Sequence, residues 1–201
     1  PVNSTTWDSS PTFSSDGKTL YFSRGVGGAR SKNMDIFKTV FDGKKWSVPV
    51  QVKELNTDKE ELAPFIHPDG ETIYFSSNGH QGMGGHDLFY SRKQKDGSWG
   101  KPINIGYPIN TGGDERGMIV NADGDLAYIS SERKGGKGGM DIYGFELYKE
   151  ARPNKVTFSR GVVYDQFTKE RLGAKFELIN IETNEVVVSS TSDDNTGEFL
   201  V

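Results

Sequence analysis

The feature that most constrains this 201-residue chain is an internal repeat. The stretch from Ser10 to Gly25 ("SPTFSSDGKTLYFSRG") matches Ala63 to Gly79 ("APFIHPDGETIYFSSNG") and, more loosely, Gly117 to Gly136 ("GMIVNADGDLAYISSERKGG"). Each copy carries an Asp-Gly pair, and the pairs recur after 53 and then 54 residues, as Asp16-Gly17, Asp69-Gly70 and Asp123-Gly124. A period of this length indicates units that bury a core only by stacking on their neighbours.

Each copy predicts four short strands. The first precedes Asp-Gly, whose glycine accepts the positive φ of a tight turn. The second ("KTLYFSR", "ETIYFSS", "DLAYISS") is rich in β-favouring residues, and the third ("DIFKTVF", "DLFYSRK", "DIYGFEL") alternates apolar with polar residues. A fourth stretch carries Pro49 or Pro102, and proline favours an outermost strand. Four strands per repeat are typical of a β-propeller blade.

The copies restart at "VNS", "LNT" and "INT", beginning at Val2, Leu55 and Ile109. Three blades are visible, and a closed ring usually takes about four to eight. We therefore expect an incomplete ring, with further blades upstream of residue 1 unless a partner chain completes it.

The repeats resemble a known family. "SPTFSSDGKTLYFS", "GMGGHDLFYS" and "DGSWGKPINIGYPINT" resemble the PD40 (WD40-like) repeats of TolB-like β-propellers, in the version found in OmpA-family outer-membrane proteins of Bacteroidetes. The resemblance covers residues 1–149, and it is specific because the motifs recur together in one order at one period.

A different pattern follows Tyr148. Residues 150–155 are charged and contain proline, which predicts a linker. Residues 156–201 are β-rich, and "GVVYD", "TKERLGAKFELIN" and "DDNTGEFLV" resemble the carboxypeptidase regulatory-like domain, a small transthyretin-type sandwich. This length is too short for the whole sandwich, so we expect a truncated one. The predicted fold class is all-β, with three propeller blades followed by a partial transthyretin-like β-sandwich.

Composition excludes several functions. The 28 acidic and 24 basic residues give a net charge of −4 with no basic cluster, so nucleic acid is not an expected partner. No apolar run of about 18 residues and no export signal is visible in this segment. The absence of cysteine excludes thiol catalysis, cysteine zinc sites and disulfides.

The loop "NGHQGMGGHDLFY" raises the question of a metal or phosphate site, because it holds His80 and His86 among four glycines. The other copies keep the glycines and the aspartate but not the histidines. Further zinc ligands are missing nearby, and "GGKGG" lacks the Lys-Ser/Thr of a Walker loop. We predict a structural loop whose aspartate accepts backbone N–H groups and whose histidines are dispensable; the recurring aspartates are Asp35, Asp87 and Asp141.

Catalysis finds little support in the residues. "SSDGKTL" resembles the Asp-box of sialidases, but Asp-boxes are hairpin turns, and the few arginines share no blade position except Arg24 and Arg133, near the end of the second strand. No Gly-x-Ser-x-Gly elbow occurs. We expect no enzyme activity and no catalytic, cofactor or metal residues. Trp46 and Trp99 are predicted to pack where the outer hairpin of a blade meets its neighbour, with a ligand-stacking platform as the alternative.

The resemblance implies a non-catalytic scaffold in the periplasm, associated with the outer membrane. Its expected partners are other envelope or secretion-system proteins, since some proteins of this kind belong to the type IX secretion system. Peptidoglycan binding is expected only through an OmpA-type domain outside this chain. The alternatives are a glycan- or peptide-binding propeller module and, third, a propeller glycosidase.

Overall fold

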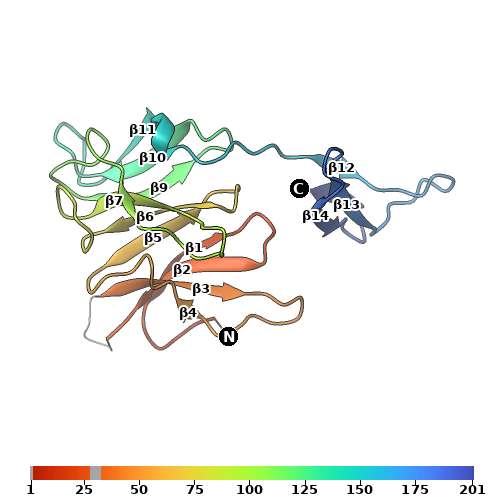
Figure 1. Ribbon diagram of the computed structural model, residues 1–201, viewed down its shortest axis with the longest axis horizontal. Coiled ribbons are helices and arrows are strands. Elements are labelled where there is room, and N and C mark those ends of the chain that lie inside the picture. Colours follow the sequence, from red (N-terminus) through yellow and green to blue (C-terminus); the bar gives the residue numbers. More distant parts are fainter. Residues whose placement is uncertain (1, 28–32) are drawn as a thin grey trace. The chain divides into compact units, whose positions relative to one another are not determined.

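The computed structural model describes residues 2–27 and 33–201. The chain divides into two compact units, Pro1–Val156 and Thr157–Val201, and nearly all of their regular elements are strands (Figure 1). Within the described residues, no helix is long and apolar enough to span a membrane.

The first unit contains three antiparallel sheets, and in each of them the strands pair in the order in which they follow along the chain. We call them blades 1, 2 and 3. Blade 1 consists of β1 (Asp8–Phe13), β2 (Thr19–Gly25), β3 (Met34–Val40) and β4 (Val50–Gln51). Blade 2 consists of β5 (Glu61–Ile66), β6 (Thr72–Ser77), β7 (Asp87–Arg92) and β8 (Ile103–Asn104). Blade 3 consists of β9 (Glu115–Val120), β10 (Leu126–Ser131) and β11 (Asp141–Glu146).

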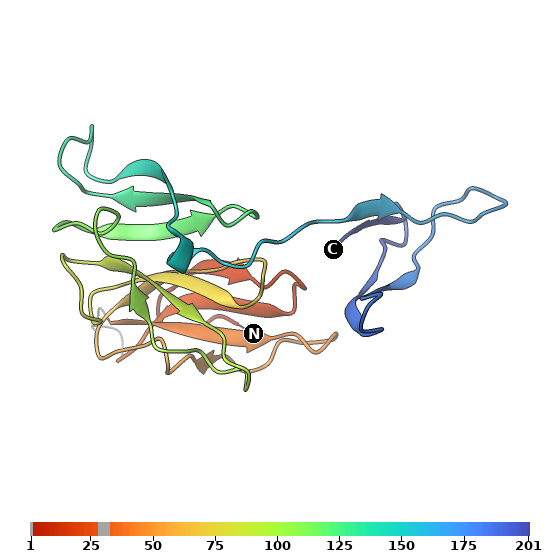
Figure 2. The same cartoon turned by 45° about the horizontal axis from the view of Figure 1, so that its top comes forward.

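The blades stack through their first strands. β1 lies against β5, and β5 lies against β9, while the fourth strands stay at the far edge of each sheet (Figure 2). Pro49 and Pro102 stand shortly before β4 and β8, which are only two residues long. This is the radial arrangement of propeller blades, so the predicted all-β fold class is confirmed.

Blade 3 lacks a fourth strand in the described chain, and the prediction of four strands in every copy is wrong there. The reason is local: no Asp-Gly-x-Trp turn follows β11, and the chain enters the short 3-10 helix η1 (Lys149–Ala151). Ala151 is buried, and its carbonyl accepts a hydrogen bond of 2.6 Å from the Tyr74 hydroxyl of blade 2. The backbone N–H of Asn154 donates to Asp69 at 2.9 Å. The segment predicted as a linker is thus bound to the blades.

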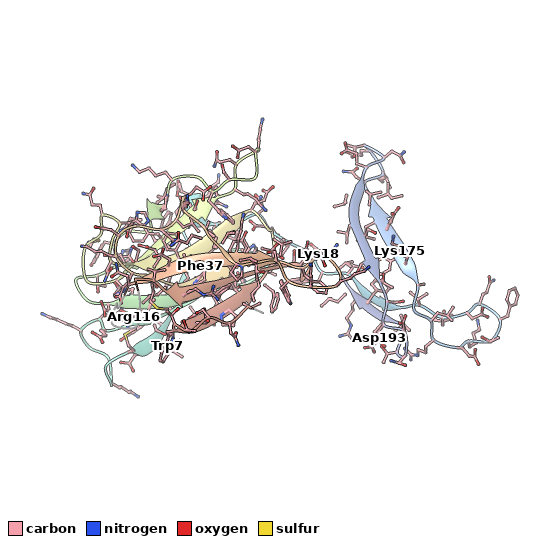
Figure 3. All side chains as sticks on the ribbon, turned by 90° about the horizontal axis from the view of Figure 1, so that it is seen from below. Trp7, Lys18, Phe37, Arg116, Lys175 and Asp193 are labelled. Atoms are coloured by element: carbon pink, nitrogen blue, oxygen red, sulfur yellow. The ribbon has the colours of Figure 1, made fainter. Side chains whose placement is uncertain are left out.

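The hydrophobic core lies between the sheets rather than within any one of them. One cluster fills the space between blades 1 and 2, and a second fills the space between blades 2 and 3. Figure 3 draws all side chains on the ribbon, with Phe37 of blade 1 and Arg116 of blade 3 among those labelled. Blade 2 is covered on both faces, so every residue of β6 is buried. The residues of the first cluster are Tyr21, Ile36, Val52, Leu55, Ile66, Ile73, Phe75, Phe89 and Trp99.

The first strand of every blade contains the same backbone irregularity. Ser10, Ala63 and Gly117 occupy equivalent positions and have φ values of 52°, 48° and 60°. The pairing register between first and second strands shifts around these positions. A side chain in this left-handed region is strained, and only Gly117 avoids the strain.

Gly117→Ala is expected to lower the free energy of unfolding by about 1 kcal/mol, because its methyl group meets nothing closer than 3.9 Å and backbone strain alone acts. Ser10→Gly is expected to raise it by up to about 1 kcal/mol for the converse reason. Gly112→Ala is the control, since its backbone is not left-handed and no atom lies within 4 Å. Thermal or urea unfolding measures all three, and equal effects at positions 112 and 117 would contradict the strain.

The second unit consists of two small antiparallel sheets. β12 (Arg160–Val162) pairs with β15 (Glu198–Leu200), and β13 (Lys175–Ile179) pairs with β14 (Val186–Thr191). Phe176 and Phe199 join the sheets, with ring centroids 4.6 Å apart. The turn before β15 is capped by Asp193, whose Oδ1 accepts the N–H groups of the second and third residues after it at 2.9 and 2.8 Å.

Candidate functional site: inter-blade clamps and a pocket across the first strands

The restart motif joins each blade to the one before it. Oδ1 of Asn56 accepts the backbone N–H of Ile36 at 2.8 Å, and Nδ2 of Asn56 donates to the Ile36 carbonyl at 3.0 Å. Asn110 binds Leu88 of blade 2 in the same way, at 2.8 and 2.9 Å. The asparagine is therefore the acceptor for the N–H of a third-strand residue and a second donor to its carbonyl, which also accepts the backbone N–H of Val52 in blade 1 and of Ile105 in blade 2, at 2.9 and 3.0 Å.

A buried carboxylate fixes the residue that follows this asparagine. Glu61 accepts hydrogen bonds from the backbone N–H and hydroxyl of Thr57, both at 2.8 Å, and from the Ser77 hydroxyl at 2.7 Å. In blade 3 Glu115 accepts the same three bonds, at 2.9, 2.7 and 2.7 Å, from Thr111 and Ser131. Both glutamates are fully buried, and these bonds compensate the loss of their hydration.

In blade 1 a carboxylate binds the restart residue and the second strand in the same way, but with other residue types. Asp8 accepts the backbone N–H of Ser4 at 2.8 Å and the Nε–H of Arg24 at 2.6 Å. Arg24 stands where blades 2 and 3 have serine, so a shorter acid is paired with a longer donor. Glu61, Glu115 and Asp8 are not among the site residues predicted from the sequence. Their signal is an acidic residue four positions after each restart Ser or Thr.

In each of blades 1 and 2, a polar side chain lies over a pair of stacked phenylalanine rings. The rings of Phe22 and Phe37 in blade 1 and of Phe75 and Phe89 in blade 2 lie 6.1 and 6.0 Å apart. Arg24 lies 4.9 and 5.1 Å above the first pair, and the His80 ring lies 5.9 and 5.3 Å from the second.

The covering side chains reach the same backbone position. His80 Nε2 lies 2.8 Å from the carbonyl oxygen of Leu55, directly before the restart asparagine. Arg24 donates to the Val2 carbonyl and Arg133 to the Ile109 carbonyl, the equivalent groups in blades 1 and 3. The Arg133 guanidinium also lies 4.7 Å from the ring of Tyr143. His80 therefore takes the same structural place as two arginines, which argues against the prediction that its side chain is dispensable.

His80→Ala is expected to lower the free energy of unfolding by about 1 to 2 kcal/mol, because the hydrogen bond to Leu55 and the cover of two rings are lost. His80→Arg is expected to lose less, since arginine meets this requirement in the other two blades. Thermal melts compare the variants with and without zinc, which should change neither. An alanine variant as stable as the parent, or a zinc effect that needs His80, would contradict the assignment.

The glycine-rich loops close on their aspartates. Oδ2 of Asp87 accepts the backbone N–H groups of Met83 and Gly84 at 2.8 and 3.1 Å. Asp141 accepts those of Lys137 and Gly138 at 2.7 and 3.1 Å. The corresponding loop of blade 1 lies partly outside the described residues, and its Asp35 accepts a hydrogen bond from the Gln51 side chain at 2.6 Å.

His86 lies at the joint between blades 2 and 3 and is buried, against the expectation of a dispensable side chain. Its Nε2 lies 3.1 Å from Glu60 Oε2, and its backbone N–H donates to Asp114 Oδ1 at 2.8 Å. Arg116 in turn pairs with Asp114 at 2.8 Å. Over residues 2–27 and 33–201, no cluster of three or more His, Cys, Asp or Glu could hold a metal ion.

The aspartates of the three Asp-Gly turns have different hydrogen-bond partners. Asp16 and Asp69 accept backbone N–H groups within their own turns, at 2.9 and 3.0 Å. Asp123 instead pairs with Lys155 at 2.7 Å, and Asn121 accepts the turn N–H groups of blade 3. The glycines have φ values of 66°, 68° and 76°, at Gly17, Gly70 and Gly124.

The two recurrent tryptophans differ in burial. Trp99 is buried in the core between blades 1 and 2, edge-on to the ring of Tyr21 at 6.0 Å. Trp46 packs on Phe13 and Phe41 of its own blade, at 5.9 and 5.2 Å. Trp99 thus lies where two blades meet, whereas the ring contacts of Trp46 lie within blade 1 and not at a junction between blades.

Two aspartates have pKa values shifted in opposite directions. Burial raises the pKa of Asp35, the Glu61 carboxylate raises it further, and the hydrogen bond from Gln51 offsets this only in part. Burial also acts on Asp69, but hydrogen bonds from His67, Glu71 and other neighbours outweigh it and lower the pKa. Ionised Asp35 therefore weakens the fold, whereas ionised Asp69 stabilises it.

Asp35→Asn is expected to raise the stability at neutral pH, and the gain should vanish as the pH falls through the raised folded pKa, where the parent becomes protonated. Asp69→Asn is expected to lower the stability at neutral pH, and this loss should shrink as the pH falls through the lowered folded pKa. Urea unfolding across the acid range measures how the stability difference between each variant and the parent changes with pH. If this stability difference changed with pH in a way that gave both variants a gain, or both a loss, at neutral pH, the opposite pKa shifts of Asp35 and Asp69 would be contradicted.

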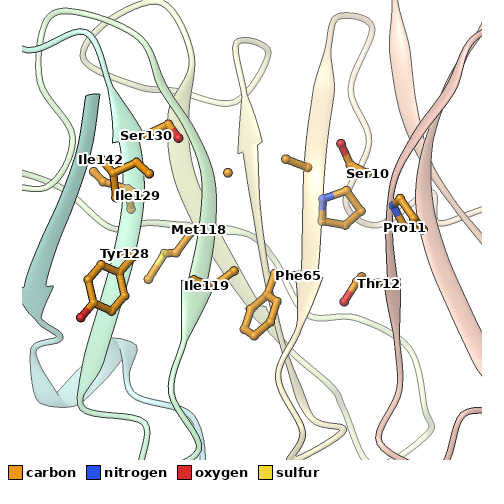
Figure 4. Close-up of a pocket in the computed structure, with 13 residues that line it drawn as sticks. Ser10, Pro11, Thr12, Phe65, Met118, Ile119, Tyr128, Ile129, Ser130 and Ile142 are labelled. Carbon is orange, nitrogen blue, oxygen red and sulfur yellow. The ribbon is translucent and has the colours of Figure 1, made fainter. Parts of the chain in front are cut away.

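A pocket of about 360 Å³ opens across the first strands of the three blades (Figure 4). Its wall comprises Ser10, Pro11, Thr12, Ala63, Pro64, Phe65, Gly117, Met118, Ile119, Tyr128, Ile129, Ser130 and Ile142. Most of these side chains are apolar, and the polar groups are hydroxyls of serine, threonine and tyrosine. No carboxylate, imidazole, amine or guanidinium lines the described wall, so the pocket suits binding better than acid–base chemistry.

The sequence matches no protein-family model. No curated protein matches it either. Two solved structures resemble it in fold: a putative TolB from Agrobacterium tumefaciens, at 17% identity and a TM-score of 0.45, and TolB from Acinetobacter baumannii, at 15% and 0.46. The matches cover 98% and 95% of this chain but 58% and 45% of those chains, so it spans about half of their length. The assignment as propeller blades rests on the strand order and packing described above.

Proposed function

We propose that this chain is a non-catalytic protein-interaction module of the bacterial cell envelope, located in the periplasm. The observation that carries the proposal is the pocket across the first strands, which offers apolar surface and hydroxyl groups but no ionisable side chain. Such a wall can receive part of another protein by burying apolar area, at about 25 cal/mol for each Å².

The hydrogen bonds of three acidic residues of the blades support a structural and not a catalytic role for them. Glu61, Glu115 and Asp87 accept hydrogen bonds from their own blade and do not line the pocket. A glycosidase site needs two carboxyl groups facing one cavity. The arrangement favours a scaffold over an enzyme.

The finer assignment rests on sequence resemblance. The PD40-like repeats support a periplasmic protein associated with the outer membrane, belonging to the OmpA family and tethered to peptidoglycan through a separate OmpA-type domain. A component of the type IX secretion system fits the same resemblance, with other envelope or secretion-system proteins as partners. The second unit is proposed to be part of a carboxypeptidase regulatory-like domain.

A glycan- or peptide-binding module is the second candidate, and the pocket favours a peptide. Phe65, Ile119 and Ile142 provide apolar surface for a side chain, and Ser10 and Thr12 provide hydroxyl groups. Among the lining residues no carboxylate, amide or guanidinium side chain is available for the hydroxyl groups of a sugar.

A photo-cross-linking amino acid at Phe65, in the full-length protein in its own cells, should form adducts with a small set of envelope proteins. The matched control replaces Phe167, a largely exposed phenylalanine of the second unit, and should not give these adducts. Fractionation of the same cells tests the periplasmic location. Adducts identical at both positions, or a cytoplasmic protein, would overturn the proposal. Saturable binding of the purified chain to insoluble peptidoglycan would favour the glycan-binding alternative.

A further inference from the structure

The blades contain five Asp-Gly pairs, and the glycine amide of one pair is bound differently from the rest. In an Asp-Gly pair the backbone nitrogen of glycine can attack the side-chain carboxyl carbon of aspartate, because glycine has no side chain to obstruct the approach. Three pairs lie in the turns between first and second strands, and two lie in the outer turns that follow the third strands. They are Asp16-Gly17, Asp69-Gly70, Asp123-Gly124, Asp42-Gly43 and Asp96-Gly97.

Four of the five glycine amides are occupied by a hydrogen bond. Each donates its N–H to the carbonyl three residues before it, at 2.9 or 3.0 Å; the four donors are Gly17, Gly70, Gly97 and Gly124. The N–H of Gly43 donates to no group in residues 2–27 and 33–201. An amide that is already bonded must break that bond before its nitrogen can react, so the hydrogen bond protects four pairs and leaves one unprotected.

The outer turn of blade 1 leaves this amide without an acceptor. The carbonyl three residues before Gly43 belongs to Val40, and it already accepts the N–H of Ser47 at 2.8 Å. The outer turn of blade 2 is one residue longer between its bridged residues, so Gln94 stands beyond the bridged pair and its carbonyl accepts the N–H of Gly97 at 2.9 Å. The difference between the two amides therefore follows from the length of the turns.

Asp42 and Asp96 are otherwise well matched. Both are exposed, and the glycines that follow them have φ values of 93° and 84°. Oδ1 of Asp42 accepts the backbone N–H groups of Lys45 and Lys44, both at 2.9 Å, and these bonds lower the pKa of its carboxyl group. Oδ1 of Asp96 accepts the hydroxyl and the backbone N–H of Ser98 at 2.6 and 2.9 Å, and its pKa is lowered too. The glycine amide is thus what distinguishes the two turns.

We propose that Asp42-Gly43 is a site of spontaneous isoaspartate formation. The Gly43 nitrogen attacks the protonated carboxyl group at Cγ of Asp42, the amide hydrogen and the carboxyl hydroxyl leave as water, and a succinimide ring closes. Water then opens the ring at either carbonyl. Opening at Cγ restores aspartate, whereas opening at the backbone carbonyl carries the main chain through the former side chain and gives isoaspartate. Water is the only other reactant.

The modification changes the outer hairpin between β3 and β4 (Figure 1). Isoaspartate lengthens the main chain of the turn by a methylene carbon and moves the carboxylate that the N–H groups of Lys44 and Lys45 bind. Trp46 follows this turn directly, and its ring packs on Phe13 and Phe41 at 5.9 and 5.2 Å. The outer edge of blade 1 is therefore the part of the fold that this modification loosens.

The test follows isoaspartate in the folded, purified chain during incubation well below its melting temperature. An isoaspartyl methyltransferase counts the modified residues, and peptide mapping with fragmentation that distinguishes the two isomers locates them. Isoaspartate should accumulate roughly fivefold faster at position 42 than at position 96, since only the second amide must first break a hydrogen bond. Asp42→Glu should remove most of the methylation, because glutamate closes a larger ring far more slowly, and the matched control Asp96→Glu should leave most of it.

Incubation in guanidinium separates the fold from the local sequence. Once the chain is unfolded no turn holds either amide, so the rates at positions 42 and 96 should become similar. Equal rates in the folded chain, a faster rate at position 96, or a difference that persists unchanged in guanidinium would overturn the proposal. Methylation that Asp42→Glu leaves at the parent level would overturn it as well.

Discussion

The hydrogen bonds that Asn56 and Asn110 make to the third strand of the preceding blade are the interaction on which the first unit depends. The fourth strands pair with the third over only two residues, and beyond them the carbonyls of Ile36 and Leu88 accept the N–H groups of Val52 and Ile105, whereas their own N–H groups need another acceptor. Asn56 and Asn110 supply that acceptor and add a second donor to each carbonyl, and buried Glu61 and Glu115 hold the following threonine in place. The short restart segments of blades 2 and 3 thus bind the edge of the preceding sheet and fix where the chain enters the next blade.

A second requirement is met by different residues in different blades. A side chain must donate to the carbonyl before the restart asparagine and lie near an aromatic ring. Arg24, His80 and Arg133 all do this from different positions of the repeat. Arg24 pairs with Asp8 as Ser131 pairs with Glu115, so the prediction that Arg24 and Arg133 share a blade position is wrong. These side chains differ in length but reach equivalent carbonyl groups. A comparison of aligned sequence positions therefore makes His80 look unique to its blade, although the arginines of the other two blades make the same contact.

The sequence predicts the features that local chemistry controls. Asp-Gly turns, aromatic second strands and rim prolines each act within a few residues, so the all-β class and the order of strands in blades 1 and 2 could be predicted. The missing fourth strand of blade 3 could not, because it depends on where the segment around Ala151 packs. The burial of His86 depends on Glu60 and on Asp114 of the next blade, which a comparison of single loops does not bring together.

The segment that leaves blade 3 has a mechanical consequence. The backbone N–H of Asn154 is bound to Asp69 of blade 2, and that of Val156 donates to the carbonyl of Ala122 in blade 3 at 3.0 Å. Tension applied through the second unit therefore reaches the seam between two blades before it reaches the open edge of β11. These hydrogen bonds thus lie between the second unit and the incomplete blade along the chain.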